Sequence, residues 1–207
     1  MHFFYLTIPR NQSYAYAYKD MSLERINQKI CTNCFQNTNT PIYNGSIHSL
    51  VLDGGDILPD HLNFCGAGGL RLVISKETKD IFEKSNISGI SEYELVNALR
   101  NTKQNSLSPL NGIKQYYLAH IQGKIEIDFK AMKLKKKKYC PICGRFQWNR
   151  QRLEPIFLDL NSWDKCDVCV IESMPTRIVL SKHVFDVVKE NGLCGFEFVP
   201  YQIKKTD

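Results

Sequence analysis

The sequence lacks the features by which membrane and exported proteins are recognised. No apolar run approaches the roughly 18 to 20 residues that a membrane-spanning helix needs. The first ten residues have no basic region ahead of their apolar stretch and no small-residue cleavage site, so they predict a first β-strand rather than a secretion signal. We therefore expect a protein that has no membrane span and stays in the cytoplasm.

Catalytic signatures are missing as well. The five histidines form neither a His-x-x-His nor a His-Glu-x-x-His pattern, and the chain has no nucleophile elbow and no P-loop. The glycine-rich stretch at residues 65–69 lacks the Lys-Ser/Thr pair that completes a phosphate-binding loop, so it predicts only a turn. We expect a protein that is not an enzyme.

Cysteine, in contrast, is abundant, because the 207 residues include eight cysteines. Six of them form three C-x2-C pairs, which are Cys31/Cys34, Cys140/Cys143 and Cys166/Cys169. A two-residue gap lets both thiolates of a pair face one tetrahedral ion, whereas a disulfide across the gap would constrain little of the unfolded chain. The pairs therefore predict a zinc site in a reducing compartment.

The pair Cys140/Cys143 has the strongest metal-binding signature, because a proline lies inside the turn and Gly144 follows it. Two other pairs compete to complete the site. Spacing favours Cys166/Cys169, which follow after a zinc-ribbon-like gap of 22 residues. However, Asp167 lies between those sulfurs and would repel a thiolate pair, and the apolar residues around Cys169 suggest a strand in which it is a small core residue.

An internal repeat favours the other pair. At an offset of 106 residues, six positions of the chain are identical, and they include serines 75 and 181 and glycines 89 and 195. Cys31/Cys34 precede the first copy much as Cys140/Cys143 precede the second, while Cys166/Cys169 have no counterpart. We predict one structural zinc ion bound by Cys31, Cys34, Cys140 and Cys143, and buried thiols without metal are the remaining alternative.

Each copy of the repeat predicts a β-helix-β unit, at residues 70–95 and 177–201. In both copies a β-rich run ends at a serine suited to cap a helix, and apolar residues cluster in the helix that follows. The helices end near Asn86 and Gly192, and another extended run comes next.

We therefore expect an α+β fold with two related β-helix-β halves and antiparallel hairpins, joined by a zinc-ribbon-like double knuckle. Residues 1–100 form the first half, with the N-terminal strand and the Cys31/Cys34 knuckle. Residues 101–112, rich in Asn, Ser and Pro, form a linker. Residues 113–207 form the second half, with a hairpin that turns at Gln122-Gly123 and the second knuckle. The halves pack into one compact unit.

The formal charge of +6 is concentrated in Lys133 and the run from Lys135 to Lys138, just before the second knuckle. One hypothesis is a nucleic-acid-binding zinc-ribbon protein that uses these lysines with neighbouring arginines and Trp148. The other is the solvated end of a hairpin, which we favour because no base-reading motif accompanies the run.

Taken together, these motifs resemble the double-CXXCG-motif family of bacterial immunity proteins. The resemblance is strongest in residues 115–129, the Cys140-Pro-Ile-Cys143-Gly144 motif, residues 163–168 and residues 178–201. The first motif departs from the family, because Phe35 stands where the family has glycine. The resemblance implies a protein that binds and neutralises a cognate toxin encoded beside it, with protein rather than nucleic acid as its partner.

Overall fold

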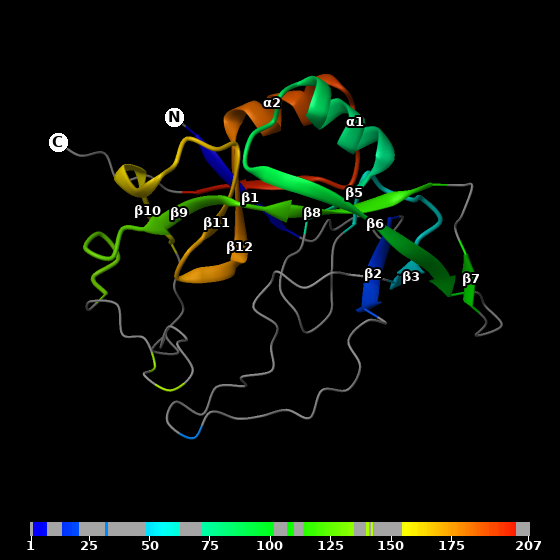
Figure 1. Ribbon diagram of the computed structural model, residues 1–207, viewed down its shortest axis with the longest axis horizontal. Helices are drawn as coiled ribbons and strands as arrows, with labels where there is room; N and C mark the ends of the chain where they lie inside the picture. The colour runs from blue at the N-terminus through cyan, green and yellow to red at the C-terminus, as the bar shows by residue number, and fades with distance from the viewer. Residues whose placement is uncertain are drawn as a thin grey trace.

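Two β-sheets and two helices make up the part of the chain that the structure describes (Figure 1). The structure is a computed structural model, and it describes residues 2–7, 14–20, 32, 49–62, 72–101, 107–109, 114–134, 140, 142 and 155–201. In this part of the chain, no helix is long and apolar enough to cross a membrane.

The first sheet has six strands, and most of them come from the second half of the sequence. In spatial order they are β10 (Leu158–Asp159), β9 (Gly123–Ile127), β11 (Val168–Ile171), β12 (Met174–Ser181), β1 (Phe3–Thr7) and β13 (Glu197–Pro200). Strands β9 and β11 are parallel, and the other neighbours are antiparallel. The N-terminal strand β1 thus completes a sheet of the C-terminal half.

The second sheet has seven strands, and one of them comes from the second half of the sequence. Its main path is β2 (Ala15–Asp20), β3 (Ser49–Gly54), β6 (Ile90–Asn101), β8 (Tyr116–Ile121), β5 (Val73–Ser75) and β4 (His61–Leu62), and β7 (Leu107–Pro109) pairs with β6. Strand β8 belongs to the second half of the sequence, yet it lies between β5 and β6 of the first half. Each half of the sequence therefore places a strand in the sheet of the other.

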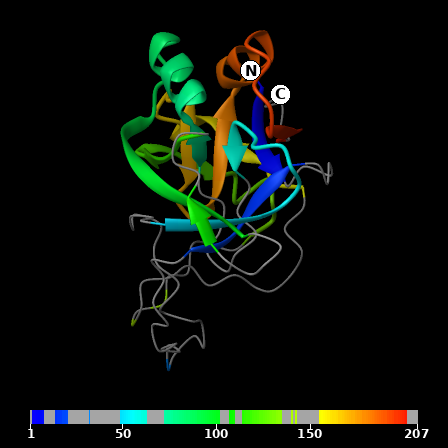
Figure 2. The ribbon, with the colours of Figure 1, turned by 90° about the vertical axis from the view of Figure 1, so that its right-hand side faces the viewer.

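Both helices begin where the serine caps predicted. Helix α1 (Lys76–Lys84) follows Ser75, whose hydroxyl accepts a hydrogen bond from the Thr78 amide, and α2 (Lys182–Glu190) follows Ser181, which does the same for Val184. After the helices, Asn86 and Gly192 have left-handed backbones with φ of 53° and 65°. Figure 2 shows the two helices on the same side of the molecule.

The central core lies beneath the two helices and joins both sheets. Phe82 of α1 and Val184 of α2 pack there with Leu6 and Leu180 of the six-stranded sheet and Ile74 of the seven-stranded sheet. A second core contains residues of the seven-stranded sheet alone, and a third contains Phe3, Ile125 and Val179 with other residues of the six-stranded sheet. The central core thus contains residues from both halves of the sequence.

The predicted α+β class with two β-helix-β halves is wrong, because the described chain is mostly β. The two helices have nine residues each, against thirteen strands. The strands on either side of each helix are not neighbours, because β8 separates β5 from β6 and β1 separates β12 from β13. Short serine-capped helices were visible in the sequence, but the strand inserted between their flanking strands comes from the other half.

The predicted hairpin at Gln122-Gly123 is also absent from the structure. The two strands exist, but β8 pairs in the seven-stranded sheet and β9 pairs with β10 and β11 in the six-stranded sheet. The turn carries the chain from one sheet to the other. Alternation of polar and apolar residues reveals a strand but does not reveal its partner. Strands β6 and β7 also reach into residues 101–112, which we expected to be a linker.

Candidate functional site

Of the four predicted zinc ligands, only Cys140 lies within the described residues. Its side chain is buried with 1% exposed, while Ile142, inside the same knuckle, is 66% exposed. Four cysteine thiolates would suit a structural zinc ion, and a ligand below the surface with the tip of its turn in solvent is compatible with such a knuckle. Cys31, Cys34 and Cys143 lie outside the described residues, and among the described ones no cluster of three His, Cys, Asp or Glu side chains is placed to hold a metal ion.

In the alternative pair, Cys166/Cys169, Cys169 is a core residue and Cys166 packs against that core. Cys169 is 1% exposed on β11, and its thiol donates to the Cys166 carbonyl oxygen at 3.3 Å and lies 3.7 Å from an Asp164 carboxylate oxygen. Burial raises the pKa of the Cys169 thiol, and the negative charge of Asp164 raises it further. These surroundings favour the protonated thiol over the thiolate that zinc requires.

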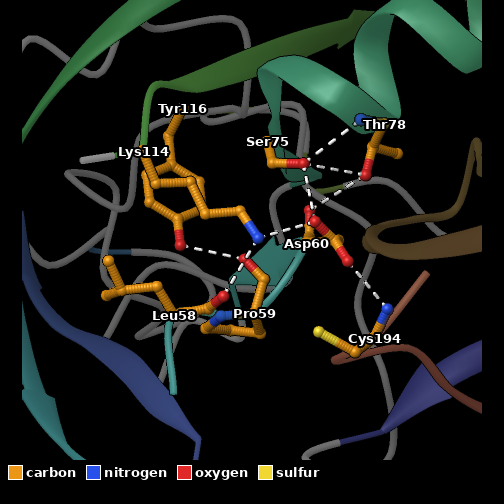
Figure 3. Close-up of polar contacts among 8 residues, drawn as sticks. All are labelled: Leu58, Pro59, Asp60, Ser75, Thr78, Lys114, Tyr116 and Cys194. Carbon is orange, nitrogen blue, oxygen red and sulfur yellow. Dashed lines mark hydrogen bonds and ion pairs between the residues drawn. The ribbon is translucent and has the colours of Figure 1, made fainter. Parts of the chain in front are cut away.

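A buried carboxylate, that of Asp60, lies at the centre of a network of hydrogen bonds (Figure 3). Asp60 accepts a hydrogen bond from the Ser75 hydroxyl at 2.9 Å and one from the backbone amide of Cys194 at 2.9 Å. Ser75 caps α1, whereas Cys194 follows α2. We call Asp60, Ser75 and the Cys194 amide the Asp60 clamp, since one side chain joins the two halves of the sequence.

A lysine neutralises this carboxylate. The Lys114 ammonium donates at 2.7 Å to the Asp60 carboxylate oxygen that also accepts from Ser75, and at 3.0 Å to the Leu58 carbonyl oxygen. Tyr116, fully buried, donates its hydroxyl to the Pro59 carbonyl oxygen at 2.9 Å. Burial alone would raise the pKa of Asp60, but the hydrogen bonds from Lys114, the Cys194 amide and Ser75 outweigh it and hold that pKa below its usual value.

A second carboxylate repeats this arrangement on the other side of the core. Asp167 accepts from the Ser181 hydroxyl at 2.7 Å, and its other oxygen accepts from the Ser88 amide at 3.1 Å and the Ser88 hydroxyl at 2.8 Å. Ser181 caps α2 and Ser88 follows α1, so the roles of the halves are reversed. We call Asp167, Ser181 and Ser88 the Asp167 clamp. Burial would raise the pKa of Asp167, but hydrogen bonds from Ser181 and Ser88 and the nearby His183 lower it overall.

Two glycines, one in the loop after each helix, allow these loops to approach the clamps closely. Gly89 and Gly195 have φ of 92° and 85°, a backbone that side chains rarely adopt. A Cβ on Gly195 would lie 2.5 Å from the Pro59 Cβ and 2.7 Å from the His61 carbonyl oxygen, and one on Gly89 would collide with the Val168 carbonyl oxygen. Both loops run against the segment that carries the clamp carboxylate.

The identities of the sequence repeat now have a structural meaning. The repeated serines are the helix caps, the repeated glycines form the close approaches, and Lys76–Asp80 and Lys182–Asp186 are matching ion pairs on the two helices. Sequence reasoning missed the two carboxylates, because an offset of 106 aligns Asp60 with Cys166. A single-residue gap would have aligned it with Asp167.

Both clamps are suited to a structural role. Each carboxylate has both oxygens engaged by donors from the protein. His61, next to the Asp60 clamp, is fully buried, and burial lowers its pKa to about 4, so the imidazole is neutral at physiological pH. The site therefore consists of satisfied polar groups that hold loops and helix ends in place.

Comparison with known proteins found no family model and no curated protein that matches the chain.

Proposed function

We propose that this protein is an immunity protein that binds and neutralises a cognate bacterial toxin in the cytoplasm. The motif resemblance supports this function directly. The structural observation that carries it is the pair of clamps, in which Asp60 and Asp167 each bind a helix cap of one half and a loop of the other. A scaffold locked in this way presents a preformed surface, and a preformed surface loses little conformational entropy when it binds a partner.

The proposal includes a structural zinc ion bound by Cys31, Cys34, Cys140 and Cys143. Four thiolates would fill the tetrahedral coordination sphere and leave no position for a substrate. The proposed ligands come from both halves of the sequence, so the ion would add a further connection between them. We accordingly propose a binding protein rather than an enzyme.

The function is tested with the product of the neighbouring gene. Co-expression of this chain should restore growth to cells that produce that toxin, and the two purified proteins should form a stable complex. A variant in which Lys135 to Lys138 are changed to serine should protect equally well, because we propose that the lysine run is only solvated. Submicromolar binding to DNA or RNA at physiological salt, lost in that variant, would instead favour the nucleic-acid hypothesis.

The zinc site is tested by elemental analysis of single Cys→Ser variants. We expect one zinc ion per chain, lost in Cys31→Ser and in Cys140→Ser and retained in the matched control Cys166→Ser. Removal of zinc with a chelator should lower the melting temperature of the whole protein, since the ion connects its two halves. Retained zinc in Cys31→Ser together with loss in Cys166→Ser would show that the wrong pair was chosen.

A further inference from the structure

A groove on the six-stranded sheet lies on the face turned away from the helices. Side chains alternate along β1, so Phe4 and Leu6 face α2 and the central core, whereas Tyr5 faces the opposite side. On that side, the groove has a volume of about 390 Å³. Its walls are formed by Tyr5, Pro155, Ile156, Arg177, Val199, Pro200 and Tyr201.

Tyr201 lines this groove, and its hydroxyl group is buried. The residue is 7% exposed, and within the described structure its hydroxyl has no hydrogen-bond partner. Among the described residues, the other deeply buried tyrosine is Tyr116, and its hydroxyl donates to a carbonyl oxygen. A buried hydroxyl without a partner is costly, so a structure that keeps one invites an acceptor from outside.

Arg177 brings a permanent positive charge to the same place. Its guanidinium carbon lies 5.8 Å from the centre of the Tyr5 ring, and it forms no ion pair with any carboxylate in the described residues. Burial raises the pKa of Tyr201, while the charge of Arg177 partly opposes that rise. The hydroxyl therefore remains a donor at physiological pH.

These groups together define the ligand. A cation and a neutral donor on residues that line one groove suit an anion with two acceptor oxygens, and a planar carboxylate can use both. Ile156, Val199 and the two prolines offer apolar walls for the body that carries the anion. We propose that this groove is a carboxylate-binding site in which Arg177 supplies the charge and Tyr201 the hydroxyl donor. This proposal is independent of the proposed immunity function.

The test uses the full-length protein and two pairs of probes. Benzoate is compared with benzamide as a free small molecule, and N-acetyl-glutamate amide with N-acetyl-glutamine amide as a protein-like side chain, with binding followed by NMR titration. At least one carboxylate should bind saturably and about tenfold more tightly than its neutral counterpart, because the charge-assisted bonds are lost in the amide. The pair that shows the difference identifies the source of the carboxylate.

Variants connect the binding to the groove. Arg177→Gln should weaken carboxylate binding by about tenfold, and Tyr201→Phe by about fivefold, as expected for one charged and one neutral hydrogen bond. Tyr201→Phe should keep the melting temperature of the wild type, because the hydroxyl has no partner to lose. Arg100→Gln, which changes an arginine on the other sheet, is the matched control and should bind normally. The absence of saturable binding by either carboxylate, or binding unchanged in Arg177→Gln, would overturn the proposal.

Discussion

The Asp60 and Asp167 clamps have the same hydrogen-bond pattern in different surroundings. Each carboxylate accepts from the serine that caps one helix and from the amide that follows the other. The Asp60 side chain is 8% exposed and pairs with Lys114, whereas the Asp167 side chain is 17% exposed and lies 3.4 Å from His183. A shared hydrogen-bond pattern therefore does not imply equal contributions to stability, because a charge that is more deeply buried costs more when its partners are lost.

The largest difference should appear when the carboxylates are neutralised. Asp60→Asn should lower the free energy of unfolding by about 3 kcal/mol, because it leaves the Lys114 ammonium without its counter-charge in a largely buried site. Asp167→Asn should cost only about 1 kcal/mol, since mainly hydrogen bonds to neutral donors are weakened. Urea unfolding of both variants measures the two values. Equal losses would mean that burial does not distinguish the clamps.

Alanine substitutions of the two glycines beside the clamps should have similar effects on the free energy of unfolding. Gly89→Ala and Gly195→Ala should each lower the free energy of unfolding by about 2–3 kcal/mol, because the new Cβ meets the clamp segment and the backbone has a positive φ. Gly192→Ala is the matched control, since its φ is also positive but its Cβ would meet nothing within 4 Å. Its cost should be about 1 kcal/mol. Thermal or urea unfolding that gave the same loss for all three would exclude the steric explanation.

The helix caps sharpen the comparison further. Ser75→Ala should destabilise the protein by about 2 kcal/mol, because Ser75 is fully buried and its hydroxyl serves both Asp60 and the Thr78 amide. Ser181→Ala should cost about 1 kcal/mol, since its bond from the Val184 amide is longer at 3.4 Å. Urea unfolding compares them, and a greater loss in Ser181→Ala would reverse the ranking of the clamps.

The smallest effect is expected in the pH dependence of the free energy of unfolding. The pKa of Asp60 is lowered in the folded protein, so its stabilising contribution is complete above the unfolded pKa of about 3.9 and is lost as the pH falls through the folded value. In Asp60→Asn, the free energy of unfolding should fall less steeply below about pH 4 than in the wild type. Urea titrations between neutral and acidic pH provide the measurement, and parallel curves would argue against ionised Asp60 as a source of stability.

Local parts of this fold could be predicted from the sequence, and non-local ones could not. Serine caps and left-handed helix ends depend on neighbouring residues, so the positions of Ser75, Ser181 and Gly192 were readable. The pairing of β1 with β12 and β13 depends on residues far along the chain, and no local signal reports it. The carboxylates were missed for a related reason, because the partners of Asp60 lie 15 and 134 residues away. The zinc ligands and the immunity function stay predictions.

The exchange of strands also has a consequence for the order of events during synthesis. Strand β1 is translated before the other described strands, but its neighbours β12 and β13 come more than 160 residues later. At about 5–20 residues per second, the N-terminal strand waits on the order of ten seconds or more for its partners. The six-stranded sheet is therefore completed only after β13 has been translated, and until its partners emerge β1 is an exposed apolar segment that a chaperone could shield.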